Sequence, residues 1–65
     1  MLVLSEAEKD LLAELEKIQS SGRIGAVAAR GLVMRGLIDG PAEARRLTQA
    51  GAAMLHELRL RSGRD

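Results

Sequence analysis

The sequence predicts a mainly α fold with a small β-hairpin, in the order helix, helix, hairpin, helix. Three observations lead to this prediction. Apolar residues recur at three- and four-residue steps in three segments, as they do on one face of a helix. Between the second and third segments, the strong turn signal Asp39-Gly40-Pro41 separates two short apolar stretches. The chain has 65 residues and no Cys, so residues 1–65 are expected to form one small domain without disulfides or a thiolate metal site.

The first helix is expected over about residues 5–19. It begins with a capping box, Ser5-Glu6-Ala7-Glu8, in which the Ser5 hydroxyl accepts from the Glu8 backbone N–H and the Glu8 carboxylate accepts from the Ser5 N–H. The apolar stripe that follows consists of Leu4, Ala7 or Glu8, Leu11, Leu12, Leu15 and Ile18. The segment Gln19-Ser20-Ser21-Gly22 is expected to end this helix.

The second helix is expected over about residues 24–35. Its predicted buried stripe is Ile24, Val27, Ala28, Gly31 and Leu32. Gly31 would then lie on the packed face and let a neighbouring backbone come close. Gly36 is expected to follow the helix in the left-handed conformation that ends many helices. The outward face would carry Arg23, Ala26, Arg30 and Val33.

A two-stranded wing is expected over about residues 37–47, with strands at 37–39 and 45–47. Thr48 is expected to cap the third helix, at about residues 49–61, whose apolar stripe is Ala50, Gly51, Met54, Leu55 and Leu58. An alternative stays open, because Pro41 suits the first turn of a helix and residues 42–46 are good helix formers. On that alternative the chain is an all-α three-helix bundle.

The stretch from Ala29 to Leu55 resembles the second half of a winged-helix domain of the multiple-antibiotic-resistance regulator (MarR) type. The matching residues are Leu32, Arg35-Gly36-Leu37-Ile38, Leu47-Thr48, Gly51 and Leu55. This resemblance is the main reason to expect strands. It implies that Leu37 and Leu47 point into the core, that Gly51 lets the last helix pack closely on the hairpin, and that the second helix enters the major groove of DNA.

The leading functional hypothesis is therefore a small regulatory protein that binds duplex DNA through phosphate contacts. The candidate contact residues are arginines of the second helix and the wing, with two of them at the wing tip: Arg23, Arg30, Arg35, Arg45 and Arg46. The chain departs from the family in three ways. Only residues 20–23 stand where the family has a separate short helix, the wing is short, and the long dimerisation helices are absent. A second hypothesis is thus a protein-interaction or inhibitor module on the same scaffold, such as an anti-defence protein of a phage or mobile element.

The charge distribution bears on both hypotheses. The net charge is only +1, but residues 1–20 hold five acidic residues against two lysines, a net of −3. Residues 21–65 hold eight arginines against four acidic residues, a net of +4. Arginine suits phosphates and carboxylates alike because its guanidinium is a planar fork. A continuous positive stripe would favour DNA, whereas a mixed surface with an exposed apolar patch would favour a protein partner.

We expect a homodimer, because a domain of this size without aromatic residues has a small core. The candidate dimer contacts are Leu2, Val3, Leu4 and Leu60. No enzyme is expected: His56 is the only histidine and falls off the apolar stripe as a surface residue, and the glycines match no phosphate-binding loop. We expect no catalytic residue, metal ligand or cofactor. The sequence also lacks a membrane-spanning or signal-peptide pattern, so a cytoplasmic protein is expected.

Overall fold

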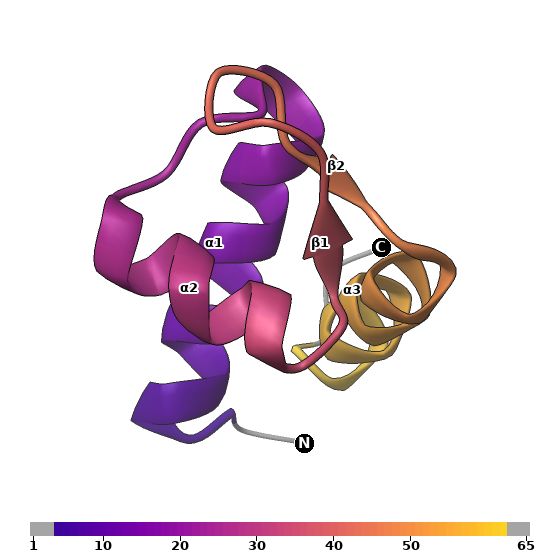
Figure 1. The fold of residues 1–65 in the computed structure, drawn as a ribbon. Coiled ribbons are helices and arrows are strands. Elements are labelled where there is room, and N and C mark those ends of the chain that lie inside the picture. The colour runs from indigo at the N-terminus through magenta and orange to yellow at the C-terminus, as the bar shows by residue number, and fades with distance from the viewer. Residues whose placement is uncertain (1–3, 63–65) are drawn as a thin grey trace.

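The computed structural model describes residues 4–62, and its elements follow the predicted order (Figure 1). They are α1 (Glu6–Ser21), α2 (Ala26–Met34), β1 (Ile38–Asp39), β2 (Arg46–Leu47) and α3 (Gln49–Arg61). The two strands pair antiparallel, with Ile38 opposite Leu47 and Asp39 opposite Arg46. The mainly α fold with a small hairpin is confirmed.

The alternative of an all-α bundle is wrong, because residues 41–46 do not form a helix. The chain turns instead, with the N–H of Ala44 donating to the carbonyl of Pro41 at 3.0 Å. Gly40 has a φ of +93°, which a residue with a side chain rarely adopts. These two features return the chain into β2.

The N-terminus of α1 is the predicted capping box. The Ser5 N–H donates to the Glu8 carboxylate at 2.9 Å, and the Glu8 N–H donates to the Ser5 hydroxyl at 3.2 Å. The helix extends two residues beyond the expected end, to Ser21. It stops at Gly22, whose φ of +74° is left-handed and whose N–H donates to the Ile18 carbonyl at 3.0 Å.

Gly36 ends α2 as predicted. Its φ is +74°, its N–H donates to the Val33 carbonyl at 2.9 Å, and the N–H of Leu37 donates to the Leu32 carbonyl at 3.0 Å. This pair of hydrogen bonds is a Schellman motif, which reverses the chain at a helix end. It directs residues 37–39 into β1.

The predicted buried face of α2 is wrong by part of a turn. Ala29 and Leu32 are buried, whereas Val27 is 89% exposed. Gly31 is also exposed, and a Cβ added there would meet nothing within 4 Å. Leu32 lies on both the predicted face and the observed face of α2. Because its neighbours in the helix are mostly small or apolar, the three- and four-residue spacing did not show which of the two faces is buried.

Thr48 joins the hairpin to α3. Its hydroxyl accepts from the Gly51 N–H at 3.0 Å and donates to the Gly36 carbonyl at 2.6 Å. Its own N–H donates to the Leu37 carbonyl at 3.0 Å. A Cβ on Gly51 would overlap that same carbonyl oxygen of Leu37. The predicted cap and the predicted close approach of α3 to the hairpin are both confirmed.

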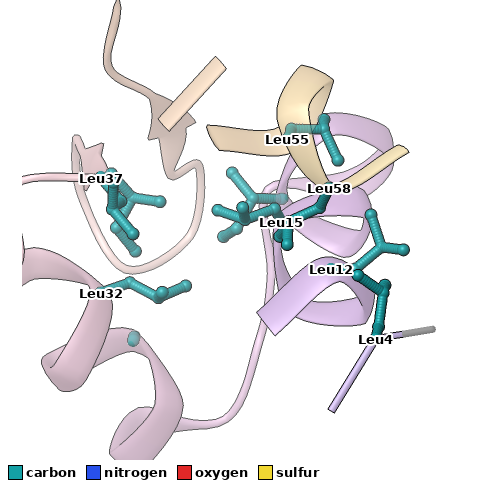
Figure 2. Packing of buried hydrophobic residues seen from close by; sticks show 10 residues of the cluster. Leu4, Leu12, Leu15, Leu32, Leu37, Leu55 and Leu58 are labelled. Carbon is teal, nitrogen blue, oxygen red and sulfur yellow. The ribbon is translucent and has the colours of Figure 1, made fainter. Parts of the chain in front are cut away.

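A single core lies between α1, α2, α3 and the hairpin (Figure 2). Its buried side chains are Leu4, Leu12, Leu15, Ile18, Ala29, Leu32, Leu37, Ile38, Leu55 and Leu58. Leu47, from β2, is half-buried against them. In Figure 1 the hairpin lies between α2 and α3. Of the α2 residues, only Ala29 and Leu32 are buried.

Candidate functional site

The outer side of α2 carries three exposed large apolar side chains, those of Val27, Val33 and Met34. The helix Ala26–Met34 contains one charged residue, Arg30. Val27 and Met34 are 89% and 81% exposed, and Val33 is 43% exposed. A helix that is apolar on all sides is normally enclosed, but here only the side of Ala29 and Leu32 is covered. We define the α2 face as its exposed residues Ala26, Val27, Arg30, Val33 and Met34.

Two grooves flank the α2 face. The first, of about 270 Å³, separates α2 from α1 and includes Val27, Gly31 and Arg35 on the α2 side, with Asp10 and Glu14 on the α1 side. We call it the α1–α2 groove. Both signs of charge line it.

The second groove, of about 470 Å³, lies between α2 and the loop that joins β1 to β2, and we call it the α2–loop groove. Its lining residues are Ile24, Ala26, Ala29, Arg30, Val33, Met34, Ala42 and Arg45. Arg30 and Arg45 are the charged residues in this lining, and the remainder of the lining is apolar. The groove is therefore basic and apolar at once.

A backbone hydrogen bond positions Arg45 in this groove. The N–H of Arg45 donates to the Gly22 carbonyl at 3.0 Å, which fixes the hairpin loop to the end of α1. In Figure 1 this loop lies beside the end of α1. Arg45 lies in the hairpin loop and is half-buried there, because this loop is attached to α1 by the hydrogen bond to Gly22. Gly22 allows this approach, since a Cβ on it would come within 3.0 Å of the Arg45 carbonyl oxygen.

The five candidate arginines are divided among several places. Arg30 and Arg45 share the α2–loop groove. Arg35 lines the α1–α2 groove instead. Arg46 is exposed and lies 3.7 Å from the carboxylate of Asp39, its partner across the hairpin. Arg23 is exposed in the turn between α1 and α2.

Two ion pairs between α1 and α3 join oppositely charged parts of the sequence. The Arg59 Nε donates to the Glu16 carboxylate at 3.3 Å, and its Nη2 donates to the Gln19 side-chain oxygen at 2.8 Å. Arg61 lies 2.7 Å from the carboxylate of Glu8. The acidic helix is thus partly neutralised within the fold. The sequence signal for these pairs is the basic last turn of α3, which was not assigned a role.

The carboxylate of Glu8 accepts a hydrogen bond from the Ser5 N–H and forms an ion pair with Arg61. The backbone N–H of Ser5, which donates to the carboxylate, holds the pKa of Glu8 below its ordinary value. The Arg61 guanidinium acts on this pKa in the same direction. Both effects stabilise the charged form of the carboxylate and support the start of α1.

Of the four candidate dimer contacts, the structure describes Leu4 and Leu60, and only Leu60 is exposed. Leu2 and Val3 lie outside the described residues. Leu4 is buried in the core of its own chain (Figure 2), so its side chain does not form the proposed dimer contact. Leu60 is 62% exposed on α3.

His56 is exposed on α3, as predicted. Among residues 4–62, no group of three His, Asp or Glu side chains is arranged to hold a metal ion. No helix in the same range has both the length and the apolar character needed to cross a membrane.

Comparison with known proteins gives no match: no family model, no curated protein and no solved structure matches the chain. The resemblance of residues 29–55 to a MarR-type winged helix therefore stays a prediction. The main feature that the sequence did not indicate is the exposure of Val27 and Met34. The near absence of charge in α2 could have indicated it, because a domain of this size buries only about 60% of the surface of its unfolded chain.

Proposed function

We propose that the chain is a protein-interaction module whose docking surface is the α2 face. The observation that carries this proposal is the exposure of Val27 and Met34 on a helix with one charge. Burying a Val or Met side chain that is otherwise exposed contributes about 1.5–3 kcal/mol. Enclosing both in an interface is therefore worth roughly 3–6 kcal/mol before the losses of association are subtracted.

The chemistry of α2 suits a protein better than a DNA groove. Helices that read the major groove do so through side chains that donate to and accept from base edges. The α2 face offers Arg30 for this and otherwise presents Ala26, Val27, Val33 and Met34. Apolar side chains with little charge beside them are typical of the centre of a protein interface. The cytoplasmic location expected from the sequence is kept as part of this proposal.

The proposal is tested by removing the apolar side chains without disturbing the fold. The variant Val27→Lys/Met34→Lys places two charges on the α2 face, and the control Ala13→Lys/Ala53→Lys places two at exposed positions of α1 and α3. Each tagged chain is recovered from its own cells after nuclease digestion. We expect a discrete protein with the wild type and the control but not with the α2 variant.

Two results would count against this function. One is recovery of the same partner protein in equal amounts with the α2 variant and with the control. The other is a retained protein that proves to be a second copy of the chain, which would make the α2 face the interface of the expected homodimer. Thermal unfolding of each variant separates lost binding from lost folding, since exposed substitutions change stability by only about 0.5 kcal/mol.

Duplex DNA is a second candidate partner, favoured by the convergence of Arg30 and Arg45 on one groove without an acidic lining residue. Fluorescence anisotropy against a labelled random-sequence duplex tests it at about 50 and 200 mM salt. Micromolar binding that collapses as the salt concentration rises would support this candidate, because phosphate contacts release counterions. Absence of binding at the lower salt concentration would remove it.

A further inference from the structure

The α2–loop groove contains two cations without an anionic partner in the described part of the chain. Every salt bridge among residues 4–62 uses a different cation: Lys9, Arg46, Arg59 or Arg61. Arg30 and Arg45 form none of them, and both line this groove. Two cations that line one groove give it a positive potential, which an anion bound there would offset. The groove therefore favours an anionic occupant.

The walls of the groove require apolar groups on the same occupant. Val33 and Met34 are exposed on its α2 side, and Ile24 is half-buried at its base. A volume of about 470 Å³ accommodates a few side chains rather than a whole domain. A bare phosphate or carboxylate would leave these apolar walls exposed to water. The occupant must combine negative charge with apolar side chains.

We propose that the α2–loop groove binds an acidic amphipathic segment of a partner protein. Carboxylates of the segment pair with Arg30 and Arg45, and its apolar side chains pack on Val33 and Met34. Arginine is suited to this role because its guanidinium binds a carboxylate through two parallel hydrogen bonds. This inference rests on the proposed protein-binding function and specifies the chemistry of the partner.

The α1 helix of a second copy of this chain is a poorer occupant. The acidic residues of the chain lie mainly on α1, where Glu8 and Glu16 are paired with the α3 arginines. The apolar side chains of α1, such as Leu12 and Leu15, are buried in the core. The α1 helix of a second copy would thus present acidic groups without the apolar side chains that the groove needs.

The test is a selection from a random-peptide library against the full chain, with affinities then measured for charge-reversed variants. Arg30→Glu reverses the exposed cation of the groove, and Arg30→Glu/Arg45→Glu reverses both. The single variant is needed because Arg45 is half-buried and anchors the hairpin loop. Lys17→Glu is the control, since it makes the same change of charge at an exposed position of α1 outside the groove.

We expect the enriched peptides to carry Asp or Glu beside large apolar residues. They should bind Arg30→Glu at least about tenfold more weakly than wild type, as loss of one member of an interfacial charge pair predicts, and bind Lys17→Glu like wild type. Enrichment of peptides without acidic residues, of no peptides, or of peptides indifferent to Arg30→Glu would overturn the inference. Duplex binding that Arg30→Glu abolishes, without acidic peptides, would identify nucleic acid as the occupant.

The same variants separate the two proposals. If Val27→Lys/Met34→Lys loses a cellular partner that Arg30→Glu retains, the α2 face binds protein but the acidic chemistry of the groove is wrong. If neither variant loses a partner, the proposed function itself fails.

Discussion

Gly51 and Gly31 both lie within helices, yet replacing each with alanine should change stability in opposite directions. A Cβ on Gly51 would overlap the carbonyl oxygen of Leu37 and lie 2.9 Å from its carbonyl carbon. The same carbonyl accepts the N–H of Thr48 at 3.0 Å, and moving it away from a new Cβ would weaken that hydrogen bond. A Cβ on Gly31 would meet nothing within 4 Å. Both are the same chemical change in the same kind of secondary structure.

The expected magnitudes follow from these two environments. Overpacking costs about 1–3 kcal/mol, and the upper end applies at Gly51 because a backbone group must move. Alanine gains about 1 kcal/mol over glycine in a helix, so Gly51→Ala is destabilising by a net of about 2 kcal/mol. For a domain of this size, that lowers Tm by roughly 8–16 °C. Gly31→Ala should gain about 1 kcal/mol and raise Tm by roughly 4–8 °C.

Thermal unfolding followed by far-UV circular dichroism measures both changes under the same conditions. The double variant provides a check, since the two sites share no contact and their effects should add. A Gly51→Ala protein as stable as wild type would refute the close packing of α3 on the hairpin. A destabilised Gly31→Ala protein would refute the exposed position of that glycine.

Three further predictions concern the core and the helix caps. Leu15→Ala should lower the free energy of unfolding, measured with denaturant, by about 2–5 kcal/mol, because this side chain is fully buried. Leu60→Ala, at an exposed position, should change the same free energy by less than about 0.5 kcal/mol. Thr48→Ala should cost about 1 kcal/mol through loss of the α3 cap, and Thr48→Ser should restore most of it; equal loss in both variants would contradict the capping role. The pKa of Glu8 is lowered in the folded chain, so its contribution to stability is present above the ordinary glutamate pKa and is lost as pH falls through the folded value. Arg61→Gln removes the neighbouring positive charge and should therefore raise the Glu8 pKa, as followed by NMR titration; an unchanged pKa would show that Arg61 does not act on this carboxylate.

The helix ends were predictable from sequence because each depends on a few neighbouring residues. A serine three positions before a glutamate, a glycine after an apolar stripe and a threonine before a helix each have a local hydrogen-bonding consequence. Ser5, Gly36 and Thr48 all behave as these rules predict. The close approach at Gly51 was predicted from the family resemblance.

The orientation of α2 was not predictable in the same way. Its sequence has small or apolar residues on every side, so the spacing that identifies a helix did not identify its buried face. The choice depends on contacts with residues that are distant in sequence. The same is true of the Arg59–Glu16 and Arg61–Glu8 pairs. The sequence therefore predicted a site made of arginines, whereas the structure indicates the α2 face and the grooves beside it.

The most direct test of the protein-binding role of α2 is photo-crosslinking from Val27 in living cells. A photoreactive amino acid replaces Val27 in one chain and the exposed Ala53 of α3 in a control chain. We predict a discrete, nuclease-resistant adduct with another protein from position 27 and none from position 53. A nuclease-sensitive adduct at position 27, or adducts no stronger there than at position 53, would contradict the assignment of the α2 face as a protein-binding surface.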